Sequence, residues 1–181
     1  MSSFVEVKEI FESAKAEEYL GENITLVEHM IQCAELAQAD KAQPWLIVAA
    51  LLHDIGHLLV PDPAHAQDSG IDLHHDEVGA EWISQRFPNN IVQVVRLHVD
   101  AKKYLVATDS DYFEHLSEAS KITLEIQGGV FSESEATEFI QQQYAYEAVQ
   151  LRKWDDAGKT RGAVATRIED YADLIREVAL D

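Results

Sequence analysis

The stretch PWLIVAALLHDIGHLL, residues 44–59, predicts a helical fold with a polar site built into it. Pro44 is tolerated in the first turn of a helix, and the following residues are apolar as far as His53 and Asp54. We expect one helix over residues 45–59, in which His53 and His57 lie four residues apart on the same face. Polar groups buried in so apolar a helix need partners or a metal ion. This stretch is therefore the first candidate for a functional site.

The rest of the chain also shows apolar residues at helical spacing, and no sustained strand alternation or hairpin turn. Thr25 is placed to cap a helix over residues 26–39, with Glu28 as its capping-box partner. The sequence predicts an all-α fold, a single helical bundle in one domain over residues 1–181. Further helices are expected over residues 5–18, 75–86, 90–100, 111–127, 133–154 and 164–179, and a loop over residues 61–70.

Composition restricts the partners that this chain can have. It has 181 residues, 33 acidic against 14 basic, and a formal net charge of −19. Such a surface repels phosphate backbones and anionic lipid, so we expect no nucleic-acid and no membrane partner. The apolar run at residues 45–52 is too short to span a bilayer, and the N-terminal residues show no signal-peptide pattern. We expect a cytoplasmic protein that acts on a small molecule, as a monomer or weak homo-oligomer.

Eight histidines make metal binding the chemistry to consider. One of them is expected mid-helix on an apolar stripe, one opens a predicted helix, and one lies near the end of another. A single helical histidine is more often a packing or surface residue, whereas four imidazoles with two carboxylates suit iron, manganese or another first-row metal. The single cysteine, Cys33, excludes a disulfide framework and is expected to be a buried packing residue. The candidate metal ligands are His29, His53, Asp54, His75, His98 and Asp155.

The order H…HD…H…H…D on helices resembles the HD-domain superfamily over about residues 19–159. In that superfamily the first histidine, the HD pair and a late aspartate bind one or two metals, and the two middle histidines mark the dinuclear members. The resemblance selects His75 over His74, because the family histidine is followed by a glycine four residues on. It selects Asp155 over Asp156, because a lysine commonly follows the family aspartate by four residues, here Lys159.

Most HD-domain proteins are phosphohydrolases, and a smaller branch consists of mixed-valent diiron oxygenases. Four segments, YLGENITLVEH, LHVDAKKYL, SEASKITLEIQGG and LRKWDD, resemble the PhnZ type of that branch, to which TmpB is related. The resemblance implies two iron ions, Fe(II) and Fe(III) at rest, with Tyr19 covering the open iron and Glu22 moving with it. His57 would lie near the substrate, which would bind Glu22, His57, Lys102, Ser120, Thr123 and Arg152.

The resemblance implies dioxygen-dependent cleavage of the carbon–phosphorus bond of an organophosphonate, a 1-hydroxyphosphonate. Glu22 suits a primary ammonium, which favours 2-amino-1-hydroxyethylphosphonate and therefore glycine and phosphate as products. A trimethylammonium substrate, as in TmpB, would favour an aromatic cage. A phosphohydrolase acting on a nucleotide or small phosphate ester, and a regulatory HD domain without metals, are the alternatives. The cage candidates are Trp82, Tyr104, Tyr112 and Phe113, and the histidines expected in solvent are His65, His74 and His115.

Overall fold

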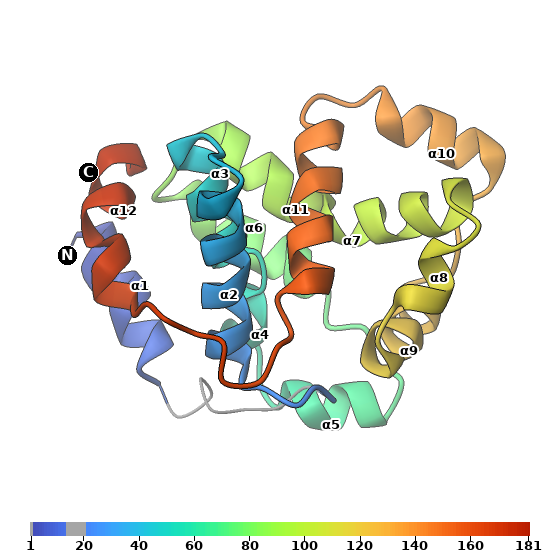
Figure 1. Ribbon diagram of the computed structural model, residues 1–181, viewed down its shortest axis with the longest axis horizontal. Helices are drawn as coiled ribbons and strands as arrows, with labels where there is room; N and C mark the ends of the chain where they lie inside the picture. Colours follow the sequence, from blue (N-terminus) through green and yellow to red (C-terminus); the bar gives the residue numbers. More distant parts are fainter. Residues whose placement is uncertain (1, 14–20) are drawn as a thin grey trace.

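The centre of the fold is a group of helices packed around one apolar helix (Figure 1). The computed structural model describes residues 2–13 and 21–181, without the side chains of residues 64, 67 and 68. All residues from Leu46 to Leu52 are buried, as expected of a helix that is apolar on every side. The helices of this group are α2 (Leu26–Ala39), α3 (Pro44–Leu52), α7 (Asn89–Thr108) and α11 (Ala145–Ala157).

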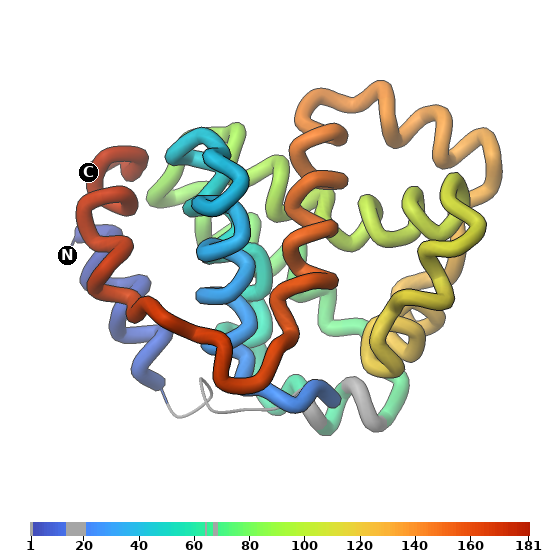
Figure 2. The backbone as a smooth tube through the Cα atoms, viewed as in Figure 1, coloured from blue at the N-terminus to red at the C-terminus, as the bar shows by residue number. Residues whose placement is uncertain are grey.

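The remaining helices cover this centre, and the two ends of the chain lie side by side (Figure 2). The backbone N–H of Ser3 donates to Asp181 Oδ2 at 2.9 Å, which ties the N-terminal helix to the C-terminus. The described residues form no strand, so the all-α prediction is confirmed. The covering elements are α1 (Ser3–Phe11), α4 (Ile55–Leu59), α5 (Pro63–Asp68), α6 (His75–Ser84), α8 (Tyr112–His115), α9 (Glu118–Ile126), α10 (Glu133–Ile140), the 3₁₀ helix Ile168–Tyr171 and α12 (Ala172–Val178).

The helix over residues 26–39 begins and ends where the sequence predicts. Thr25 Oγ1 accepts from the backbone N–H of Glu28 at 3.2 Å, and Glu28 Oε2 accepts from the backbone N–H of Thr25 at 2.8 Å. This reciprocal pair satisfies two N–H groups that the first turn of a helix leaves without partners. The capping box therefore fixes the start of the helix that carries His29.

The predicted single helix over residues 45–59 is wrong, because the backbone leaves the helical conformation at Asp54. Asp54 has φ −102° and ψ 11°, so α3 ends at Leu52 and α4 starts afresh at Ile55. Aspartate readily leaves a helix interior because its side chain competes for backbone partners. The break places the two polar residues at a corner between two helices, where both face inward.

Most other predicted boundaries need correction for local reasons. Helix 111–127 is divided into α8 and α9 because Ser117 Oγ caps α9, accepting from the backbone N–H of Ser120 at 3.1 Å. Helix 133–154 is divided into α10 and α11 because Tyr144 takes a left-handed conformation with φ 69°. The first helix ends at Phe11, α5 forms within the predicted loop, α7 runs on to Thr108, and the last segment turns helical only at Ile168.

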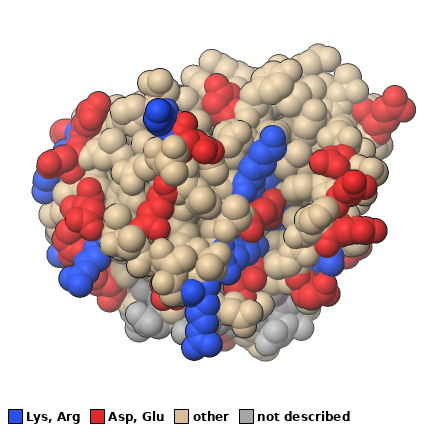
Figure 3. Space-filling view, in the orientation of Figure 1, with Lys and Arg blue, Asp and Glu red and all other residues tan. Residues whose placement is uncertain are grey.

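The surface is acidic, with an exception on one face. Figure 3 shows acidic side chains scattered widely, and basic side chains gathered in a band over α11 and the segment that follows it. Among the described residues, no helix is both long and apolar enough to cross a membrane.

Candidate functional site

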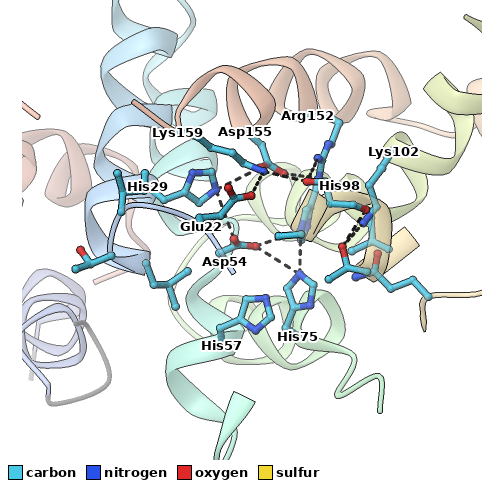
Figure 4. Close-up of a pocket in the computed structure, with 18 residues that line it drawn as sticks. Glu22, His29, Asp54, His57, His75, His98, Lys102, Arg152, Asp155 and Lys159 are labelled. Atoms are coloured by element: carbon cyan, nitrogen blue, oxygen red, sulfur yellow. Dashed lines mark hydrogen bonds and ion pairs between the residues drawn. The ribbon is translucent and has the colours of Figure 1, made fainter. Parts of the chain in front are cut away.

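The Asp54 carboxylate lies between two pairs of histidines (Figure 4). Asp54 Oδ1 is 3.4 Å from Nε2 of both His75 and His98. Asp54 Oδ2 is 3.6 Å from Nε2 of His29 and 3.4 Å from Nε2 of His53. One carboxylate thus divides its two oxygens between two adjacent groups of imidazoles. Burial acts to raise the pKa of Asp54, but the imidazoles, His53 first, outweigh it and hold that pKa well below its usual range.

Backbone carbonyls fix the tautomer of three of these histidines. Nδ1 of His29, His53 and His98 lies 2.9, 2.8 and 2.6 Å from the carbonyl oxygens of Gly158, Ala50 and Val95. A carbonyl only accepts, so each Nδ1 carries a proton, and each Nε2 faces the centre, where it can offer a lone pair to a metal ion once it is deprotonated. Buried His53 Nε2 has no hydrogen-bond partner among the described residues. Converging lone pairs with carbonyl-bound Nδ1–H groups are the donor arrangement that metal-binding histidines show, so these residues fit metal ions.

Asp155 completes the first histidine group. Its Oδ1 is 3.2 Å from His29 Nε2, and its Oδ2 is 4.0 Å from His53 Nε2. Arg152 Nη1 donates to Asp155 Oδ2 at 2.6 Å. Burial acts to raise the pKa of Asp155, but the Arg152 guanidinium outweighs it and keeps the carboxylate ionised. The structure therefore offers two donor groups, with Asp54 between them.

The structure separates the two neighbouring alternatives of the motif. His75 is buried at the start of α6, whereas His74 is exposed. Asp156 bonds the Tyr112 hydroxyl and Arg152, outside the histidine cluster. His65 and His115 are also exposed, as predicted.

Two close backbone approaches place His75. A Cβ on Gly56 would lie 1.8 Å from the carbonyl oxygen of His75, and one on Gly79 would lie 3.2 Å from the backbone nitrogen of Gly56. Only glycine permits such contact between α4 and α6. His57, from α4, stacks on His75 with ring centroids 3.9 Å apart. Burial, and then the charge of His75, lowers the pKa of His57 well below its usual range, so His57 is neutral.

Cys33 lies behind the His29 ring and is buried, as predicted. Its Sγ is 3.8 Å from His29 Nδ1, and the thiol donates to the carbonyl oxygen of Trp154 at 3.6 Å. Burial, followed by the charges of Asp155 and Asp54, raises the pKa of this thiol well above its usual range. Cys33 is therefore a neutral packing residue, although it lies close enough to His29 and His53 to count among possible ligands.

The histidine cluster opens on a cavity with a cationic wall. Lys102 and Arg152 are 2% and 4% exposed, and Lys159 lies beside them (Figure 4). Arg152 and Lys159 already pair with carboxylates, whereas Lys102 forms no ion pair with any described carboxylate. A buried amine without an anionic partner favours a small anion as ligand. The predicted site residues that line the cavity are Glu22, His29, Asp54, His57, His75, His98, Lys102, Ser120, Thr123, Arg152 and Asp155.

Lys102 has fewer hydrogen-bond partners within the protein than Arg152. Lys102 Nζ donates to Thr123 Oγ1 at 2.9 Å. Burial, and then the charge of Arg152, lowers the pKa of Lys102 to about 7. Arg152 already contacts Asp155, Asp156, Tyr112 and Ser120. Lys102 is thus the more available anion-binding group, while Arg152 also holds the carboxylate of Asp155 in place.

Lys159 and Gln127 line the cavity and were not predicted as site residues. Lys159 Nζ is 2.9 Å from Glu22 Oε1. Burial acts to lower the pKa of Lys159, but Asp155 and then Glu22 outweigh it and raise that pKa. Gln127 Oε1 is buried without a hydrogen-bond partner among the described residues. Lys159 could have been predicted as a site residue from its position four residues after Asp155. No feature of the sequence marks Gln127 as a site residue.

The four aromatic candidates for a trimethylammonium cage lie outside the cavity lining. Trp82, Tyr104, Tyr112 and Phe113 do not line the cavity, and no other described tryptophan, tyrosine or phenylalanine lines it. Tyr104 instead packs on Phe139, with ring centroids 5.3 Å apart. The predicted role of Tyr19 as a cover for the metal site lies outside the described residues.

The sequence matches one family profile and is similar to three known proteins. The sequence profile of the HD domain matches residues 26–127. A [1-hydroxy-2-(trimethylamino)ethyl]phosphonate dioxygenase (glycine-betaine-forming) of Leisingera caerulea is 43% identical over 150 residues, 83% of this chain and 76% of that protein. A hydroxymethylphosphonate dioxygenase of Gimesia maris is 38% identical over 156 residues, 84% of this chain and 77% of that protein. An uncharacterized protein of Acanthamoeba polyphaga mimivirus is 33% identical over 171 residues, 93% of this chain and 78% of that protein.

Proposed function

The chain belongs to the HD-domain family and is an oxygenase, and on this premise we propose that it uses dioxygen to cleave the carbon–phosphorus bond of a 1-hydroxyphosphonate. In the proposed reaction the hydroxyl-bearing carbon becomes a carboxylate and phosphorus leaves as phosphate. The two atoms of dioxygen balance the equation, one in each product. The observation that carries the proposal is the histidine cluster around Asp54, open on a cavity with buried cations.

We propose that the cluster holds two iron ions, Fe(II) and Fe(III) at rest. One ion would be held by His29, His53 and Asp155, the other by His75 and His98, and both by Asp54. Bound iron supplies the one-electron and dioxygen chemistry that amino-acid side chains lack. The mixed nitrogen and oxygen donor set supports iron, although it also suits other first-row metals.

The other side chains bind and orient the substrate. Lys102 and Arg152 attract the phosphonate dianion, and the hydroxyls of Ser120 and Thr123 donate to its oxygens. Both hydroxyls already lie within hydrogen-bond distance of these cations, so a phosphonate would enter a preformed set of donors. Neutral His57, stacked on His75, borders the same cavity and would limit where the substrate sits.

For the substituent on the hydroxyl-bearing carbon we propose an aminomethyl group. The substrate would then be 2-amino-1-hydroxyethylphosphonate and the products glycine and phosphate. The support is Glu22, a carboxylate on the cavity wall that suits an ammonium, and a described lining without the aromatic rings that a trimethylammonium group favours. The substrates in the names of the two dioxygenase relatives differ at this substituent.

The test is oxygen-dependent phosphate release. Iron-loaded protein is incubated without oxygen with 2-amino-1-hydroxyethylphosphonate, its trimethylammonio analogue, or hydroxymethylphosphonate, and oxygen is then admitted. We expect one phosphate per dioxygen consumed, with the highest kcat/KM for the amino substrate and glycine as its product. Steady phosphate release from a phosphomonoester without oxygen, and none from any phosphonate, would reject the proposal in favour of a phosphohydrolase.

A further inference from the structure

Lys159 forms an ion pair at the part of the cavity where the substituent of the substrate would lie. It follows the end of α11, and its Nζ is 2.9 Å from Glu22 Oε1. The side chains of Lys159 and Glu22 are only 15% and 21% exposed. Ser117 Oγ donates to the same oxygen, Glu22 Oε1, at 2.6 Å. The carboxylate is therefore already engaged before any ligand arrives.

Glu22 is the lining carboxylate that remains for a cationic group. Asp54 faces four imidazoles, and Asp155 faces His29 and the Arg152 guanidinium. Any ammonium entering the cavity therefore meets Glu22 as its partner and Lys159 as a neighbour of like charge. A substrate ammonium would therefore have to displace Lys159 before it could pair with Glu22.

We propose that Lys159 competes with the substrate ammonium for Glu22, and so sets how strongly the cavity discriminates amino-substituted from unsubstituted phosphonates. This inference rests on the proposed function, because it concerns the substituent of the same substrate.

Lys159 has a second position available on the anion side of the cavity. Its Nζ is already 2.9 Å from Ser120 Oγ, a hydroxyl that Arg152 Nη2 also contacts at 3.3 Å. An ammonium that takes the place of Lys159 at Glu22 therefore does not leave the lysine without a partner, because Ser120 Oγ still accepts from it. An unsubstituted phosphonate leaves the pair of Lys159 and Glu22 intact and gains nothing from Glu22.

The test measures binding rather than turnover. Iron-loaded protein, kept free of oxygen, is titrated calorimetrically with methylphosphonate and with 2-aminoethylphosphonate, which lack the hydroxyl group. Lys159→Met should raise the affinity for 2-aminoethylphosphonate relative to methylphosphonate by about tenfold, because Glu22 loses its cationic partner and keeps only the hydroxyl of Ser117. Lys159→Arg keeps the charge and should leave the ratio near the wild-type value. Lys121→Met is the matched control, since Lys121 pairs with Glu118 at 2.9 Å and does not line the cavity.

The outcomes separate this inference from the proposed function. A ratio unchanged in Lys159→Met, while both ligands still bind, would overturn the competition. Failure of the wild-type protein to bind either phosphonate would instead count against the proposed function. If Lys159→Met does not fold, Glu22→Gln provides the second test. It should lower the relative affinity for 2-aminoethylphosphonate, and an unchanged ratio would again overturn the inference.

Discussion

Replacing Lys102 with methionine should stabilise the metal-free protein at about pH 6. The reason is that burial of the charged lysine in the site lowers the free energy of unfolding. Lys102 is 2% exposed, and burial, followed by the charge of Arg152, lowers its pKa from 10.5 to about 7. A tenfold fall in proton affinity is worth about 1.4 kcal/mol, so the charged lysine destabilises the folded state by roughly 5 kcal/mol below pH 7. Methionine has a similar length but loses the 2.9 Å hydrogen bond to Thr123. That bond contributes about 1 kcal/mol, which leaves a net gain of roughly 4 kcal/mol.

The gain should shrink as the pH rises. Between about pH 7 and 10.5 the unfolded chain still binds the Lys102 proton while the folded state has released it. Stability of the wild-type protein relative to the variant therefore rises with pH, and the net gain falls to about 1 kcal/mol near pH 9. Urea unfolding followed by circular dichroism, with a chelator and without phosphate in the buffer, measures the difference. An equal difference at about pH 6 and pH 9, or a variant less stable at pH 6, would refute the reasoning.

Three further predictions test other parts of the structure. Glu22→Ala should raise the KM for an amino-substituted hydroxyphosphonate by about tenfold and change kcat less, since a carboxylate–ammonium pair is lost; an unchanged KM would contradict the role of Glu22. Gly56→Ala should reduce both the metal content and the free energy of unfolding, because its Cβ would lie 1.8 Å from the His75 carbonyl oxygen. A wild-type metal content would contradict this, since it would mean that α4 and α6 can move apart without loss of the metal site. Thr25→Ala should lower the free energy of unfolding by about 1 kcal/mol through loss of the cap, with metal content unchanged.

Local signals in the sequence predicted the parts of the fold that local interactions determine. The capping box at Thr25 and Glu28 depends on residues three apart, and the start of α2 is confirmed. The six candidate metal ligands also lie together, because polar residues on the buried faces of helices have to face one another or a common partner. Their roles as ligands stay predictions until metal content is measured.

The features that could not be predicted from the sequence depend on contacts between residues far apart in the chain. The break at Asp54 is favourable because His29, His75 and His98 surround its carboxylate, and these come from three other parts of the chain. The ion pair of Lys159 with Glu22 joins residues far apart in the sequence, and no periodic pattern marks it. The aromatic candidates for a cage do not line the cavity, because packing with distant residues places them, as it places Tyr104 on Phe139.

The iron content and magnetic coupling of the purified protein show most directly whether Asp54 joins two metal ions. Asp54 faces both histidine pairs, so we expect about two irons per chain, with the electron paramagnetic resonance signal of a coupled Fe(II)/Fe(III) pair. Asp54→Ala should lose that signal and most of the iron, while circular dichroism reports whether the helices are retained. Less than about one metal per wild-type chain under iron-replete conditions, or two irons without coupling, would contradict the central claim that Asp54 joins two metal ions in one site.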